Sequence, residues 1–369
     1  MNLFVADPHW GWWIIGYFYL GGIAAGAYFA ATLIDLFGGA TDREAARLGY
    51  RIAFPLVVVC GVLLIVDLDR PARFWHMLLR SEIVHEALRT GWPWSAASWR
   101  LMVQAPLLKY WSPMSIGSWA LLLFGLCSAL SLLGSLWRDG RLARLLRWSR
   151  PARVLQAVGC GVGFFVAAYT GALLTATNQP LWSDSTWIAP LFLTSAASTG
   201  LSTLILLGSF RRSVAAESLH RLERADRWVL LLELAVFAVF LASLGGLLLP
   251  VLYTGHGRLL AAGTLGVGIL VPLGMHFRPG GLGKTLGAAV FALVGGFILR
   301  YAILSTPPEL LTRPPEGEPA VARDAVQADR SPWLPHFSPE DGREPGAAGA
   351  DPGNRPAVLR PASKVFTDE

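Results

Sequence analysis

The sequence predicts an all-α integral membrane protein with eight transmembrane helices, and two observations support this fold class. Hydrophobic residues make up 53% of the 369 positions and charged residues only 15%, which separates the chain from soluble globular domains. The apolar residues also fall into eight segments, each close to the roughly 20 residues that a helix needs to cross a bilayer core. We therefore expect a multi-pass helical bundle surrounded by membrane lipid.

The predicted spans follow one another along most of the chain. They cover residues 11–37, 50–66, 114–137, 154–175, 187–210, 228–252, 259–277 and 285–304. The second span is the shortest and contains Pro55, so its limits are the weakest part of the assignment. No basic residue precedes the first span, which is also too long for the core of a signal peptide, and we expect it to stay in the protein.

Basic residues predict the orientation of these spans. They crowd the loops after the first, third and fifth spans, around Arg47, from Arg138 to Arg153, and around Arg221. Neither the N-terminal residues nor the loop 176–186 carries Lys or Arg, so the positive-inside rule places both termini outside the cytoplasm. The loop 67–113 is an exception, because it puts several basic residues outside. The pI of about 9.5 reflects this topology and does not call for nucleic acid as a partner.

The chain does not contain the ligands for a metal cofactor. Cys60, Cys127 and Cys160 all fall within predicted spans and form no Cys-x-x-Cys pair, which argues against an iron–sulfur cluster on ligand count. A bis-histidine haem needs two facing histidines, and only His276 lies within a span. We expect no haem and no iron–sulfur cluster in this chain, so electrons for any redox reaction come from another subunit.

Polar side chains from separate spans converge near the predicted outer surface. They are Trp13, Tyr17, Tyr169, Thr170, Thr199 and Arg300. Polar groups at membrane depth are functional candidates by default. Two simpler interpretations remain open: Arg300 can snorkel to the interface, and the tryptophan and tyrosines can belong to an interfacial aromatic belt.

A charged and aromatic segment, VDLDRPARFWHML at residues 66–78, ends the second span. Its notable side chains are Asp67, Asp69, Arg70, Arg73, Trp75 and His76. One interpretation is a plain membrane-exit loop. The other is a lid over a site just beneath the outer surface, or a contact for a partner subunit.

A second polar set lies toward the predicted cytoplasmic side. Asp35, Glu233 and His276 belong to three different spans, and buried ionisable groups of this kind can form a proton path. Alternatively, Asp35 is a boundary residue and Glu233 pairs with Arg224 or Arg227.

Six motifs together resemble the NrfD/PsrC family, the membrane subunits of polysulfide reductase-like complexes. In chain order they are YFYLGGIAAGAYFAATLIDL, DLDRPARFWHML, SPMSIGSWALLLFG, AAYTGALLTATNQPLW, PLFLTSAASTGLS and GGFILRYAIL. The resemblance covers about residues 10–305. It implies a multi-pass protein of the bacterial inner membrane, with eight helices in two four-helix bundles and both termini on the periplasmic side.

The implied bundles divide the chain into consecutive parts. Residues 1–150 supply three helices of the first bundle, with the long outer loop 67–113, and residues 151–186 supply its fourth helix and another outer loop. Residues 187–304 form the second bundle. The remaining residues, 305–369, are rich in Pro, Gly and charge, and this composition predicts an extended tail.

The resemblance also implies a function. Family members bind a quinone, menaquinone or ubiquinone, near the outer face, and exchange electrons with a ferredoxin-like 4Fe–4S subunit. That subunit is linked to a molybdopterin catalytic subunit or to multihaem cytochromes. Tyr169 matches the quinone-contacting tyrosine of the fourth helix, whereas Trp13 and Tyr17 stand where polysulfide reductase has Asn and His. The resemblance further implies that the segment 66–78 shields the quinone pocket.

The leading hypothesis is thus a quinone-interacting electron-transfer subunit. Two alternatives remain: a cofactor-free membrane anchor whose quinone site is lost, and a proton-translocating module of an electron-transfer complex. The anchor hypothesis remains because Trp13 and Tyr17 differ from the residues of polysulfide reductase at these positions. The proton-module hypothesis remains because Asp35 and Glu233 could carry protons.

Overall fold

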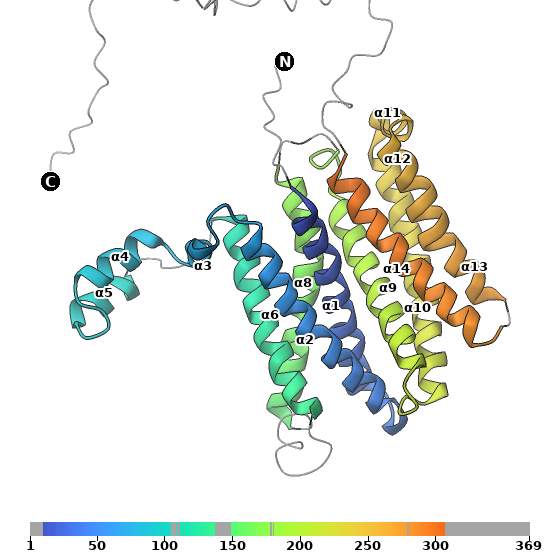
Figure 1. The fold of residues 1–369 in the computed structure, drawn as a ribbon, viewed down its shortest axis with the longest axis horizontal. Coiled ribbons are helices and arrows are strands. Elements are labelled where there is room, and N and C mark those ends of the chain that lie inside the picture. The colour runs from blue at the N-terminus through green and yellow to red at the C-terminus, as the bar shows by residue number, and fades with distance from the viewer. Residues whose placement is uncertain are drawn as a thin grey trace, which may run out of the picture. The chain divides into compact units, whose positions relative to one another are not determined.

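The computed structural model describes residues 10–104, 109, 111–136, 149–177, 179, 181–278 and 280–306. For residues 101–104 it describes the backbone only. Most of the basic run expected between Arg138 and Arg153, and nearly all of the expected tail 305–369, lie outside these residues. The regular secondary structure of the described residues is helical throughout (Figure 1), which confirms the all-α prediction.

Seven helices in the described part of the chain are long and apolar enough to cross a membrane, and a bent helix pair is an eighth candidate. Six of the seven are α1 (Trp12–Phe37), α2 (Arg43–Val66), α6 (Pro113–Leu136), α8 (Arg150–Thr175), α9 (Ile188–Ser209) and α14 (Leu282–Leu304), and α10 (Ala216–Ser243) is the first helix of the bent pair. The seventh predicted span is a composite of α12 (Gly255–Leu259), the π-helical η4 (Leu260–Leu270) and α13 (Val271–Phe277). The multi-pass prediction is confirmed.

Two spans begin well before their predicted limits. Helix α2 begins at Arg43, seven residues before the predicted start at Tyr50, and runs through Pro55 to Val66. Helix α10 begins at Ala216, although the prediction started this span at Trp228. Both extensions are helical turns rich in charged residues. A prediction from hydropathy assigns such residues to loops, even where the backbone stays helical.

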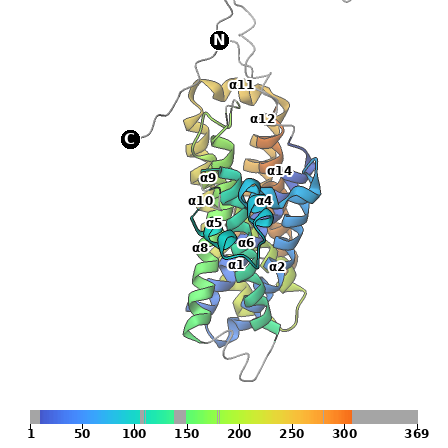
Figure 2. The ribbon, with the colours of Figure 1, turned by 90° about the vertical axis from the view of Figure 1, so that its left-hand side faces the viewer.

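The sixth span also ends differently. Helix α10 stops at Ser243, short of the predicted limit at Leu252, and η3 (Gly245–Leu247) and α11 (Leu248–Tyr253) follow at an angle of 97°. Gly245 adopts a φ of +52°, a conformation that glycine reaches without steric cost. This turn carries α11 across the end of the bundle (Figure 2).

The helices form two groups, which meet through contacts among α1, α8 and α9. The first helix group consists of α1, α2, α6 and α8. The second helix group consists of α9, which packs against α10 and α14, together with η4 and α13, which lie on α14. Helix α1 crosses α9 where Gly26 meets Gly200: a Cβ on Gly26 would lie 2.0 Å from the Ala196 carbonyl oxygen. The small residues therefore allow the two backbones to touch, as is common between membrane helices.

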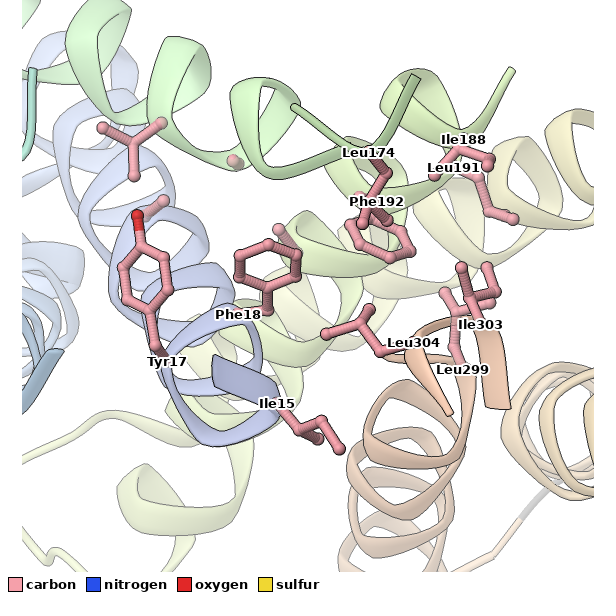
Figure 3. Packing of buried hydrophobic residues seen from close by; sticks show 14 of the residues in the cluster. Ile15, Tyr17, Phe18, Leu174, Ile188, Leu191, Phe192, Leu299, Ile303 and Leu304 are labelled. Carbon is pink, nitrogen blue, oxygen red and sulfur yellow. The ribbon is translucent and has the colours of Figure 1, made fainter. Parts of the chain in front are cut away.

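The core at this junction is aromatic and aliphatic. Phe18 of α1 lies edge-on to Phe192 of α9, with ring centroids 6.2 Å apart. Figure 3 shows side chains of α8, α9 and α14 gathered around Phe18, with Tyr17 at the margin of the cluster. This packing places Tyr17 at the boundary between the core and the first helix group.

The predicted loop 67–113 is folded. Beyond α2 it contains η2 (Pro71–Arg73), α3 (Trp75–Leu78), α4 (Ser81–Arg89) and α5 (Ala96–Gln104). The segment 66–78, called the lid from this point, is fastened to α6 by Trp119, whose Nε1 donates to the Leu78 carbonyl at 2.8 Å. Helices α4 and α5 project away from the bundle (Figure 1). A plain exit loop does not describe this segment.

Candidate functional site

A hollow of about 170 Å³ opens among α1, α2, α6, α8 and the lid. It lies where α1 and α6 begin and where α2 and α8 end, and this end of the bundle is called the lid end. Its walls are Trp10, Ile14, Tyr17, Phe18, Leu64, Asp67, Leu68, Met77, Met114, Gly117, Ser118, Tyr169 and Leu173. Two phenols, a carboxyl and a hydroxyl thus face one another across mainly apolar walls, the usual composition of a small-molecule site.

Tyr17 supplies an uncommitted donor to this hollow. Its side chain is only 5% exposed, yet among the described residues its hydroxyl has no hydrogen-bond partner. The phenol ring packs edge-on against Phe18, with centroids 5.4 Å apart. Because Tyr17 lines the hollow, its hydroxyl is free to donate to a ligand oxygen there.

Tyr169 lies on the opposite wall and is held in place by its neighbours. Its ring stacks on Phe165 at 5.6 Å, and its hydroxyl donates to the carbonyl of Pro113. Gly117 of α6 makes room for it, since a Cβ there would lie 2.3 Å from Tyr169 Cε1. The Tyr169 oxygen still has a lone pair for an incoming proton or donor.

Asp67 brings an ionisable group to the same hollow. It caps α2, and its backbone N–H donates to the Leu63 carbonyl at 3.0 Å. Burial raises the pKa of the Asp67 carboxyl, and the charge of Asp69 raises it further. A carboxyl with a raised pKa at the mouth of a hollow can carry protons.

The other candidates for the quinone site lie elsewhere. Trp13 does not line the hollow, and its side chain is 51% exposed, as expected of an aromatic belt. Thr170 is buried and donates to the Ala167 carbonyl at 2.8 Å. Thr199 donates to the Ser195 carbonyl at 2.8 Å. Of the residues grouped in the sequence, the structure therefore places Tyr17 and Tyr169 in the hollow and these three outside its lining.

Arg300 is buried in the second helix group, and the snorkelling interpretation is wrong. The side chain is 1% exposed. Its Nε donates to the Phe18 carbonyl at 3.1 Å, and Nη1 donates to Ser195 Oγ at 3.1 Å and to the Gly296 carbonyl at 2.8 Å. Arg300 also lies over the Phe192 ring, 5.4 Å from its centroid. The guanidinium therefore helps to join α1, α9 and α14.

The remaining lid residues surround the hollow or face away from it. Asp69, Arg70 and Arg73 are exposed, and no ion pair joins the two aspartates to the two arginines in the described part of the chain. Trp75 packs on His76, with centroids 3.9 Å apart. The exposed charges leave this face available to a partner.

The three residues grouped as a proton path separate into two places. Asp35 lies in the first helix group, where Gln156 Nε2 donates to its Oδ2 at 3.4 Å. Glu233 and His276 lie in the second group. The carboxyl of Glu233 is beside the Ser195 and Ser198 hydroxyls and close to Arg300, so the alternative pairing with Arg224 or Arg227 is also wrong.

Asp226 joins the second polar set and was missed in the sequence. It is fully buried, and His276 Nε2 lies 3.1 Å from its Oδ2. The prediction began this span at Trp228, which left Asp226 in a loop. Its spacing of seven residues from Glu233, two turns on one helix face, was the available signal.

Trp10 and Ser118 were missed in the hollow. Ser118 lies in SPMSIGSWALLLFG, a motif that already carried the resemblance, whereas Trp10 precedes the first predicted span. Trp10 stacks on Trp182 at 5.2 Å, a contact between distant segments that sequence periodicity does not reveal.

Comparison with known proteins gives consistent matches along the helical part of the chain. A family model described as "Polysulphide reductase, NrfD" matches residues 5–307. The C component of the polysulfide reductase of Wolinella succinogenes is 29% identical over 322 residues, covering 80% of this chain and 93% of that protein. Protein NrfD of Escherichia coli K12 is 27% identical over 323 residues, with the same coverage. A shorter stretch of 79 residues is 29% identical to the C component of the selenate reductase of Mesobacillus selenatarsenatis, covering 21% of this chain and 18% of that protein.

Proposed function

Because the chain belongs to the NrfD family of polysulfide reductase membrane subunits, we propose that it exchanges electrons between a membrane quinone and an iron–sulfur subunit. The family establishes a membrane subunit of an oxidoreductase complex. The quinone site is the more specific part of the proposal. Its strongest support is the hollow at the lid end, where the uncommitted hydroxyl of Tyr17 faces Tyr169 and Asp67.

The hollow suits the headgroup of a menaquinone or ubiquinone. The bound quinone supplies a two-electron, two-proton couple. Tyr17 would donate a hydrogen bond to one quinone oxygen, Ile14, Phe18 and Leu173 would exclude water, and Asp67 would exchange protons with the solvent beside the lid. Tyr169 keeps its donor on the Pro113 carbonyl and would border the headgroup on the wall opposite Tyr17.

The electrons pass to or from a partner, since the sequence provides no redox centre. We propose a ferredoxin-like subunit with 4Fe–4S clusters, linked to a molybdopterin catalytic subunit or a multihaem cytochrome. Two of the relatives, from polysulfide reductase and selenate reductase, are by name parts of reductases. The exposed Arg70 and Arg73 at the lid offer a positive face for docking.

We propose the bacterial inner membrane as the location, with the lid end on the periplasmic side. Arg43, Arg47, Arg211 and Arg221 lie at the opposite end of the bundle, which the positive-inside rule assigns to the cytoplasm.

Substitution of Tyr17 tests the quinone site. Tyr17→Phe removes the uncommitted donor, so quinone affinity should fall by about tenfold, the upper range for one hydrogen bond. The measurement is saturable quenching of tryptophan fluorescence by a quinone analogue in lipid nanodiscs. Tyr19→Phe is the matched control, because the Tyr19 hydroxyl donates to the Leu293 carbonyl at 3.1 Å, away from the hollow.

Two outcomes would contradict this site. Equal losses of affinity in the two variants would place the quinone elsewhere. The absence of saturable binding to the parent protein would favour the cofactor-free anchor.

The second helix group favours a further candidate function, a proton path. Asp226 and Glu233 of α10 lie close to His276 of α13 and Arg300 of α14 respectively, and Ser195 and Ser198 of α9 lie beside Glu233. Buried ionisable groups are costly in a membrane and usually serve transport of charge. We propose that this line carries protons toward the interior from the end opposite the lid.

Glu233→Gln tests the path. In the complete complex in proteoliposomes, the variant should keep quinone affinity and lose most quinone-coupled proton movement. Glu217→Gln is the control, because Glu217 lies on the same helix, is exposed and pairs with Arg221 at 2.5 Å. Unchanged quinone-coupled proton movement in Glu233→Gln would contradict the proposed proton path.

A further inference from the structure

A second, larger hollow of about 430 Å³ lies between α2 and α6, beneath α3. Its lining is apolar apart from Ser118, and includes Phe54, Gly61, Phe74, Leu78, Gly125 and Leu126. Leu122 and Leu126 at its rim are both more than half exposed, and in a spanning helix such exposed side chains face lipid. The hollow is therefore a groove that opens toward the bilayer, and it is called the α2–α6 groove.

The groove is continuous with the hollow at the lid end. Leu64, Leu68, Met77 and Ser118 line both. Leu64 and Leu68 come from the end of α2 and the residues after it, Met77 from α3, and Ser118 from α6. A molecule whose polar end occupies the small hollow has this groove as a direct apolar continuation into the membrane.

We propose that the α2–α6 groove binds the isoprenoid tail of the quinone. The inference rests on the quinone site proposed above and assigns the part of the molecule that this site is too small to hold. The groove lining has no charged side chain and a single hydroxyl, so it suits a branched hydrocarbon chain and offers nothing to a polar headgroup. Its continuity with the headgroup hollow favours the quinone tail over a free lipid acyl chain.

The lid then has two separate faces. Asp67 lines the headgroup hollow, Phe74 and Leu78 cover the groove, and Leu68 with Met77 lies at the junction. Within VDLDRPARFWHML, Asp67 serves the polar part of the ligand and Phe74 serves the hydrocarbon. Asp69, Arg70 and Arg73 stay exposed.

Glycine gives a direct way to fill the groove. Gly61 lines the groove, and a Cβ there would meet no atom within 4 Å, so Gly61→Leu adds a side chain to the groove wall from a Cβ that has open space. Gly125→Leu fills it from the other wall, where the nearest atom to a new Cβ is Val57 Cγ1 at 3.4 Å. Gly161→Leu is the matched control, because Gly161 is an exposed glycine of α8 with open space around it and lines neither hollow.

The experiment compares two probes, menaquinone-4 with its isoprenoid tail and menadione without one. Saturable quenching of tryptophan fluorescence is measured for the full chain in nanodiscs, and thermal unfolding verifies that each variant is folded. Gly61→Leu and Gly125→Leu should weaken menaquinone-4 binding at least tenfold and change menadione binding less than twofold. Gly161→Leu should change neither.

Other results would overturn the inference. Unchanged menaquinone-4 affinity in both groove variants would show that the tail runs elsewhere, with the headgroup site intact. Equal losses for both probes would show that Gly61 and Gly125 shape the headgroup hollow instead. A parent protein that binds neither probe would overturn the quinone site itself, and the groove with it.

Discussion

Tyr17 and Tyr169 face the same hollow with hydroxyl groups in different states. Tyr169 already donates to Pro113, whereas Tyr17 has no partner among the described residues. The sequence resemblance matched Tyr169 to the quinone-contacting tyrosine of the family, whereas Tyr17 stands where polysulfide reductase has a histidine. The geometry favours Tyr17 as the hydrogen-bond donor, because its hydroxyl is not already used within the protein.

Asp67 predicts a specific pH dependence. Because burial and Asp69 raise the pKa of its carboxyl, Asp67 stays protonated to a higher pH than an ordinary aspartate, whose pKa is about 3.9. The acidic limb of quinone turnover should therefore lie above that value, and Asp67→Asn should remove it.

The sign of this limb depends on the direction of the reaction. Quinol oxidation needs the ionised carboxylate of Asp67 as proton acceptor, so its turnover should increase as the pH rises through the Asp67 pKa. Quinone reduction needs the protonated carboxyl as proton donor, so its turnover should decrease over the same pH range. Turnover by the complete complex at a series of pH values measures the limb. A profile that is identical in Asp67→Asn would exclude Asp67 from proton exchange.

At the scale of helices, hydropathy predicted the spans well and their charged ends poorly. The membrane requires apolar side chains only across its core, so Arg43–Gly49 of α2 and Ala216–Arg227 of α10 remain helical without being apolar. Asp226 lay in one of these overlooked turns. Hydropathy also cannot detect that a helix bends at Gly245, because the flanking residues are equally apolar.

Gly117 of α6 is the helix position on which the site depends most. Gly117→Ala would place a Cβ 2.3 to 2.8 Å from the Tyr169 ring and hydroxyl, which forces the phenol away and reshapes the hollow. Quinone affinity should fall at least fivefold while the protein remains folded.

Gly161→Ala is the control, since its new Cβ would meet no atom within 4 Å and Gly161 lines neither hollow. Quinone titration and thermal unfolding of both variants separate a local effect from general destabilisation. Equal affinity in Gly117→Ala and the parent would show that the Tyr169 position is not critical.

At the scale of the molecule, the polar groups divide between two helix groups. Sorting residues by their depth along each span correctly brought Tyr17 and Tyr169 together at one end. Depth gives no information on which neighbouring helix a side chain faces. The same sorting therefore grouped Thr199 and Arg300 of the second helix group with Tyr17 and Tyr169. It also combined Asp35 of the first helix group with Glu233 of the second. Only tertiary packing, set by contacts such as Gly26 with Gly200, resolves that direction.

A quinone headgroup in the hollow among α1, α2, α6, α8 and the lid can be located by photo-crosslinking the complex with an azidoquinone, followed by peptide mass spectrometry. Adducts are expected on Trp10–Phe18, on Asp67–Met77 or on Met114–Ser118, and excess unlabelled quinone should suppress them. Adducts confined to α10, α13 or α14, with the same suppression, would place the headgroup elsewhere.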